Sequence, residues 1–70
     1  METNSSLSNI ERQRQILAQV EQRQRINVAQ ICELFLVSEA TARRDLEQLA
    51  EQGKVKRVQG GAIAVHSAPP

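Results

Sequence analysis

The tightest constraint on the fold is a connection of about three residues between two segments with helical apolar spacing. This spacing predicts helices over Val28–Leu36 and Glu39–Gln52. Asn27 and Ser38 stand where the side chain of an N-cap would accept backbone N–H groups of the first turn, and Gly53 suits a left-handed C-cap. Two short helices joined this closely, the second longer, are typical of a helix-turn-helix. The predicted inward residues are Val28, Ile31, Leu34 and Phe35 in the first helix and Ala42, Leu46, Leu49 and Ala50 in the second.

An additional amphipathic segment precedes this pair, from Ser8 to about Gln22. Ser8 followed three residues later by Glu11 has the pattern of a capping box, in which each side chain accepts a backbone N–H of the other residue. The apolar stripe consists of Ile16, Leu17 and Val20, with Ile10 near its edge. These features predict a first helix over the segment.

The apolar period changes near the C-terminus. Lys54–Val58 and Ala62–Val65 are suited to strands, and Gln59-Gly60-Gly61 between them has turn chemistry, which predicts a β-hairpin. Val55 and Val58 are three residues apart, so strict alternation fails and a bulge or twist is expected.

The order of elements defines a fold class. Arg25–Val28 is a candidate brief strand ahead of the second helix. Three helices followed by a hairpin form a winged helix, so we predict a mostly α fold with a small β-hairpin. The predicted organisation is a flexible tail at 1–7, a winged helix-turn-helix domain at 8–66 and the start of a linker at 67–70. Within the domain, the helix-turn-helix is predicted at about 28–52 and the wing at about 54–65.

Length and composition exclude several classes of function. A chain of 70 residues forms one small domain, with too few residues to wall an ordinary catalytic cleft. The single cysteine, Cys32, excludes an intramolecular disulfide and a multi-cysteine zinc site. No stretch is long and apolar enough to span a bilayer. We therefore expect no enzyme, no cofactor, no metal and no membrane partner.

Two segments carry a resemblance to a known family. They are Val37-Ser38-x-x-Thr41-x-Arg43-Arg44-Asp45-Leu46 and Arg57-Val58-x-Gly60-Gly61-Ala62. At this spacing the chain, from Ser8 to Val65, resembles the N-terminal DNA-binding domain of DeoR-type bacterial transcriptional repressors. It departs from the family pattern at Leu36, where glycine is usual, at Ala42, where isoleucine or valine is usual, and at Gln59, where histidine or arginine is common.

The resemblance implies a function and partners. It implies sequence-specific binding to double-stranded operator DNA, and repression of a sugar or metabolite operon in the bacterial cytoplasm, at the nucleoid. Full-length members of the family carry a C-terminal domain that senses a phosphorylated sugar or related metabolite and mediates homo-oligomerisation. The linker predicted at 67–70 would lead to that domain, which is absent from these 70 residues.

The distribution of charge points to a DNA-binding surface. The net charge of +1 divides into zero over residues 1–37, −2 over 38–52 and +3 over 53–70. The recognition helix nevertheless carries Arg43 and Arg44 in its N-terminal half, which should enter the major groove. The residues expected to read bases are Thr41, Arg43, Arg44 and Gln48. Of these, Thr41, Arg44 and Gln48 are expected to point mostly outward from the helix. The residues expected to contact the DNA backbone are Arg25, Asn27, Ser38, Lys56 and Arg57, and those expected to contact DNA from the wing are Gln59, Gly60 and Gly61.

Each of these residues also has a structural interpretation. Ser38 and Asn27 are helix caps first, Arg44 could contact a phosphate or only water, and Asp45 is expected to orient a neighbouring arginine. Arg12, Arg14 and Arg23 are expected to be solvated, Cys32 to be a small buried apolar residue and His66 to belong to the tail. The alternative functions are a winged helix of another repressor family and a protein-interaction winged helix, which would need an exposed apolar patch.

Overall fold

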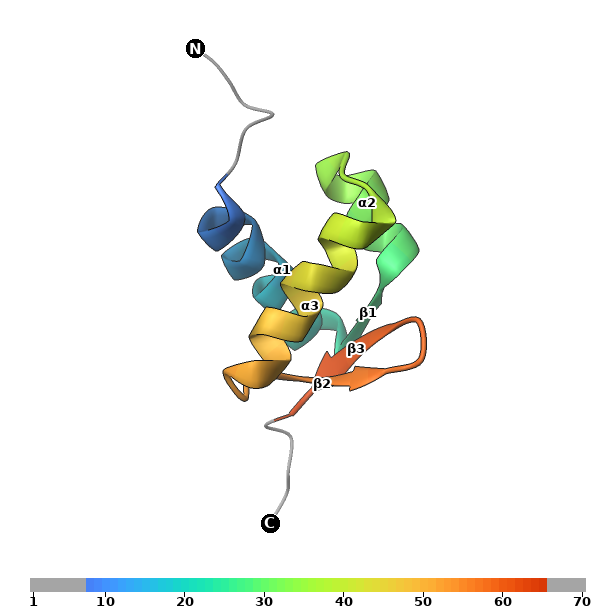
Figure 1. The fold of residues 1–70 in the computed structure, drawn as a ribbon. Helices are drawn as coiled ribbons and strands as arrows, with labels where there is room; N and C mark the ends of the chain where they lie inside the picture. The colour runs from blue at the N-terminus through green and yellow to red at the C-terminus, as the bar shows by residue number, and fades with distance from the viewer. Residues whose placement is uncertain (1–7, 66–70) are drawn as a thin grey trace.

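Residues 8–65 are described by this computed structural model, so the predicted tail at 1–7, His66 and the predicted linker at 67–70 lie outside the described residues. The helices are α1 (Asn9–Arg23), α2 (Val28–Phe35) and α3 (Glu39–Glu51), and the strands are β1 (Arg25–Asn27), β2 (Val55–Val58) and β3 (Gly61–Ala64). Helix α3 packs against both α1 and α2, and the sheet lies beside its C-terminal half (Figure 1). The predicted winged helix-turn-helix fold class is confirmed.

The wing is part of a three-stranded antiparallel sheet with the order β1-β3-β2. The predicted strand after α1 is therefore present, and it pairs with the distant strand β3. The pairing of β2 with β3 runs unbroken from Val55 opposite Ala64 to Val58 opposite Gly61, so the predicted bulge is wrong. Val55 is buried whereas Val58 is 38% exposed, because residues three apart in a strand lie on opposite faces.

The hairpin turn consists of Gln59 and Gly60, and Gly61 is the first residue of β3 rather than part of the turn. Gly60 has a φ of +79°, which glycine adopts without strain. At Gly61, a Cβ would lie 2.2 Å from the carbonyl oxygen of Ile26 and 2.7 Å from the Cα of Asn27. Glycine is needed here because the backbone of β1 approaches β3 closely.

Side-chain caps start all three helices. Ser8 Oγ accepts the N–H of Glu11 at 3.2 Å, but the reverse bond of the predicted capping box is absent among the hydrogen bonds of residues 8–65, and Glu11 is exposed to water. A complete capping box is instead found at α2, where Asn27 Oδ1 accepts the N–H of Gln30 at 2.8 Å and Gln30 Oε1 accepts the N–H of Asn27 at 3.0 Å. Gly53 follows α3 with a φ of +79°, as predicted.

The core lies between the three helices and the inner face of the sheet. Its buried apolar residues are Ile16, Val20, Ile26, Val28, Ile31, Ala42, Leu46, Leu49, Val55 and Ala62. Cys32 and Phe35 are half-buried against it, whereas Leu34, predicted to face inward, is 54% exposed. Within residues 8–65 no helix is long and apolar enough to cross a membrane.

Candidate nucleic-acid interface

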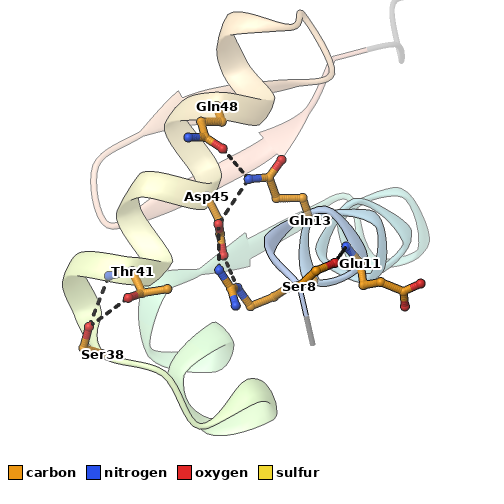
Figure 2. Close-up of polar contacts among 8 residues, drawn as sticks. Ser8, Glu11, Gln13, Ser38, Thr41, Asp45 and Gln48 are labelled. Carbon is orange, nitrogen blue, oxygen red and sulfur yellow. Dashed lines mark hydrogen bonds and ion pairs between the residues drawn. The ribbon is translucent and has the colours of Figure 1, made fainter. Parts of the chain in front are cut away.

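The N-terminal half of α3 is an ordered, exposed surface. Ser38 Oγ accepts the backbone N–H of Thr41 at 3.2 Å, and the two hydroxyl groups also form a hydrogen bond of 3.2 Å (Figure 2). The predicted cap at Ser38 is therefore present. Thr41 is half-buried, rather than pointing mostly outward, while Glu39 and Ala40 are exposed. The first turn of α3 thus presents a capped backbone, with the small side chain of Ala40 and the carboxylate of Glu39 exposed to solvent.

Arg43 and Arg44 follow on the exposed surface of α3. The Nη2 atom of Arg43 lies 3.7 Å from Glu39 Oε1, one helical turn away, in an ion pair open to solvent. Arg44 forms no ion pair with any residue of the described range. Of the two, Arg44 therefore offers a guanidinium group with all its donors available to a ligand.

Gln48 is turned toward α1, which corrects the prediction that it points mostly outward. It is half-buried, and its Oε1 accepts a hydrogen bond from Gln13 Nε2 (Figure 2). Within residues 8–65 no hydrogen bond uses its amide nitrogen. That nitrogen is therefore the polar atom of Gln48 without a partner among the described residues.

The wing lies beside the start of α2. The N–H of Val28 donates to the carbonyl oxygen of Gly60 at 2.9 Å, so the hairpin turn is held against the N-terminus of α2. A hollow of about 200 Å³ lies at this place, lined by residues 25–27 of β1 and 58–63 of the hairpin. The structure thus brings together five of the predicted contact residues. Arg25, Asn27, Gln59 and Gly60 are exposed, whereas Gly61 is buried.

The two basic residues of β2 differ in their surroundings. Lys56 is exposed, but Arg57 is half-buried. The Nε atom of Arg57 donates to the carbonyl oxygen of Gly61 at 3.1 Å, and its Nη1 atom lies 3.6 Å from Glu47 Oε2 on α3. Arg57 therefore braces the hairpin against the recognition helix. Its expected contact with the DNA backbone stays a prediction.

The comparisons with known proteins decide the family. The family model of the DeoR-like helix-turn-helix domain matches residues 12–68. The chain belongs to the DeoR family. This DeoR-family domain is thus a DNA-binding domain of a transcriptional regulator, and the surface formed by α3 and the wing is its candidate DNA interface.

Curated relatives of this DeoR-family domain are bacterial regulators. It is 52% identical over 48 residues to the transcriptional repressor GlcR of Bacillus subtilis, covering 69% of this chain and 19% of the relative. It is 42% identical over 55 residues to the regulator YulB of Bacillus subtilis (79% and 21%), and 40% identical over 58 residues to the transcriptional repressor AccR of Agrobacterium fabrum (83% and 22%). The chain therefore spans about a fifth of the length of these relatives. No solved structure matches it.

A buried polar cluster behind the recognition helix of this DeoR-family domain escaped the sequence analysis. Arg12 of α1 forms a two-pronged ion pair with Asp45 of α3, through Nε to Oδ2 and Nη2 to Oδ1, so the prediction of a solvated Arg12 is wrong. Gln13, only 7% exposed, donates to Asp45 Oδ1 at 3.2 Å. Asp45 does orient an arginine, as predicted, but the partner is on another helix.

A sequence signal for Gln13 does exist. It precedes Ile16 by three residues and Val20 by seven, so it continues the buried stripe of α1 by one turn. A polar residue at an inward position needs a hydrogen-bonding partner. Across from it, Asp45 interrupts the inward face of α3 in the same way. Two polar residues on facing stripes are the pattern that indicates such a pair.

Proposed function

We propose that this domain binds operator DNA by inserting the N-terminal half of α3 into the major groove, with Thr41, Arg43 and Arg44 at the base edges. The observation that carries the proposal is Arg44, exposed and unpaired among the described residues, on a helix fixed by its cap. An arginine in this position can bind both acceptors of guanine. Gln48 would meet the groove with its amide nitrogen, a hydrogen-bond donor, because its oxygen is turned toward Gln13.

The wing and the start of α2 would bind the DNA backbone. Lys56 is exposed and can neutralise a phosphate, and Arg25, Asn27, Gln59 and Gly60 cluster where a second strand of the duplex would pass. Ser38 would present the N-terminus of α3 to a phosphate. In this proposal Gly61 and Arg57 support the wing from within.

The full-length protein would be a homo-oligomeric repressor of a sugar or metabolite operon, located at the nucleoid. Two relatives of the domain, GlcR and AccR, are named as transcriptional repressors, and these relatives are more than three times as long as the chain. The remaining length would hold an effector domain that binds a phosphorylated sugar and mediates oligomerisation. The proposal involves no catalytic step.

The test is to select bound sequences from a random pool of duplex DNA with two copies of the domain joined by a flexible linker. A single module of this size buries only about 600–1,000 Å² on DNA and binds weakly alone, so joining two copies supplies the missing avidity. We expect a repeated half-site. Recovery of sequences without any shared half-site would contradict sequence-specific binding.

Replacing Arg44 by alanine tests the residue that carries the proposal. Arg44→Ala should cost about 1–3 kcal/mol of binding free energy on the selected site and relax the preference at one base pair, because the two hydrogen bonds to one base are lost. Fluorescence anisotropy on the selected site and on random DNA measures both effects. Arg14→Ala, an exposed arginine on α1, is the matched control. An equal loss on both DNAs would reassign Arg44 to the backbone.

A further inference from the structure

We propose that Gln13, a buried residue of α1 that contacts no DNA, is a specificity-determining residue, because it fixes the orientation of the Gln48 amide in the recognition helix. The inference rests on the proposed function, since it concerns which chemistry α3 presents to the groove. It starts from four hydrogen bonds that link Arg12, Asp45, Gln13 and Gln48 behind the exposed face of α3. Figure 2 shows how Gln13 lies between Asp45 and Gln48.

The first step fixes the amide of Gln13. Asp45 is 2% exposed, and its carboxylate is held by the guanidinium group of Arg12 through both oxygens. A carboxylate in an ion pair only accepts hydrogen bonds, so Gln13 must point its nitrogen, and not its oxygen, at Asp45. Burial strengthens this choice, because an amide with its oxygen against the carboxylate would leave a buried group without a partner.

The second step carries the orientation to Gln48. The nitrogen of Gln13 has two hydrogens, and the second one is donated to Gln48 Oε1. Gln48 must therefore turn its oxygen inward, which leaves its nitrogen on the side of the amide away from Gln13 (Figure 2). In this orientation Gln48 presents its nitrogen, a hydrogen-bond donor, on the side away from Gln13.

The fixed orientation of the Gln48 amide restricts which base Gln48 can recognise. A free glutamine can bind adenine through two hydrogen bonds, accepting from N6 and donating to N7, which requires its oxygen and nitrogen side by side at the base edge. The oxygen of Gln48 is instead turned toward Gln13 of α1. A donor is matched by the acceptors of guanine (O6 and N7) or thymine (O4). We therefore expect guanine or thymine, and not adenine, at the position that Gln48 reads.

The experiment repeats the selection from random DNA with Gln13→Met, Gln48→Met and the double variant. Methionine keeps the length of the Gln13 side chain and removes its polar atoms. In Gln13→Met, Gln48 is released, so preference at its position should shift toward adenine by about tenfold relative to guanine, with the other positions unchanged. In a Gln48→Met background, Gln13→Met should change no preference at all.

A merely structural role of Gln13 would give a different result. It would lower the affinity for all sequences together without moving the preference at one position, and that result would overturn the proposal. So would an unchanged profile in Gln13→Met or in Gln48→Met, or independent effects in the double variant. These failures leave the Arg44→Ala result intact. Failure of the wild-type tandem domain to select any half-site would instead remove the proposed function and this inference together.

A second measurement uses the wild-type side chain of Gln13, so it does not depend on whether Gln13→Met folds. Side-chain amide resonances of glutamines are observable by NMR in the isotope-labelled wild-type chain, and Gln48→Met assigns that of Gln48. On addition of the selected DNA, the NH₂ signals of Gln48 should shift, while those of Gln13 should stay protected from hydrogen exchange in the free and bound states. Rapid hydrogen exchange of the Gln13 side-chain amide in either state, or no shift of the Gln48 signals, would overturn the proposal that Gln13 fixes the orientation of Gln48.

Discussion

At the scale of single residues, Leu36 is the least expected feature of the chain. It ends α2 with a φ of +55° and a ψ of +49°, a left-handed conformation in which glycine or asparagine is favoured, and its side chain is 86% exposed. A leucine in this conformation carries a strain of about 1 kcal/mol or more. Its exposed side chain contributes little packing in return. The short connection to α3 therefore imposes this backbone on whichever residue stands there.

This strain gives a prediction for stability. Leu36→Asn should raise the free energy of unfolding by about 0.5–1 kcal/mol, because asparagine tolerates the left-handed region and lacks the greater unfolded-state entropy of glycine. Urea unfolding followed by circular dichroism measures the change. The matched control is Leu34→Asn, an exposed position inside α2, where the lower helix propensity of asparagine should lower stability. A loss of stability in Leu36→Asn would show that Leu36 makes contacts worth more than the strain.

Gly61 is a residue whose role the sequence suggested only in part. Gly61→Ala should lower the free energy of unfolding by about 3 kcal/mol, in the range of severe overpacking, because its Cβ would overlap the backbone of β1 at Ile26. Gly60→Ala is the control: a Cβ there meets nothing within 4 Å, so only the strain of its positive φ, about 1 kcal/mol, remains. Thermal unfolding separates the two. Equal effects would mean that β1 moves away easily.

At the scale of elements, acidic residues partly neutralise the basic groups of the interface. Arg43 is paired with Glu39 within α3, and Arg57 of β2 is paired with Glu47 of α3. Exposed pairs of this kind add little stability, since water screens them. Their larger effect is on binding, because a carboxylate beside the DNA repels phosphates and competes for the arginine.

Removing one of these acids should therefore strengthen binding. Glu47→Gln should raise the affinity for specific and random DNA alike by a few-fold at low salt, with a smaller gain at high salt, because the added term is electrostatic. Fluorescence anisotropy at two salt concentrations measures it. Glu21→Gln, exposed on α1, removes the same charge away from the proposed interface and should change affinity less. An unchanged or weaker affinity in Glu47→Gln would place α3 outside the DNA interface.

Helix boundaries were predicted well because local chemistry sets them. Asn27 and Ser38 cap α2 and α3 as predicted, and the observed ends differ from the predicted ones by one residue. The presence of the hairpin was predicted, but the pairing of its residues was not. Its register depends on β1, whose pairing with β3 places Gly61 in a strand, and no local pattern encodes that approach.

At the scale of the whole molecule, the ion pair between Arg12 and Asp45 joins α1 to the recognition helix across 33 residues of sequence. Helical spacing places Gln13 and Asp45 on the inward faces of their helices, but it does not show that Arg12 meets Asp45, because the two residues are far apart in sequence. The exposed members of the candidate interface were easier to find, since arginines on the outward face of an amphipathic helix follow from periodicity alone. The exposure of Arg43 and Arg44 was therefore predictable, whereas the inward turn of Gln48 and the pairing of Arg12 with Asp45 were not.

The ion pair predicts a large effect on stability. Arg12→Met should lower the free energy of unfolding by about 3 kcal/mol, because it leaves the carboxylate of Asp45 buried without its partner. Adding Asp45→Leu should recover most of that loss, since two apolar groups fill the same space. Urea unfolding of the three proteins measures both steps. A single variant within about 0.5 kcal/mol of wild type would show that the pair is not desolvated.

The interface itself is tested most directly by mapping DNA binding on the isotope-labelled chain with NMR. Backbone amide shifts on addition of the selected half-site should concentrate at 38–44 in α3, at 27–30 at the start of α2 and at 56–60 in the wing. The outer face of α1, around Arg14 and Glu21, should show no change. Shifts concentrated on α1, with the N-terminal half of α3 unaffected, would contradict the assignment of α3 as the helix that reads DNA.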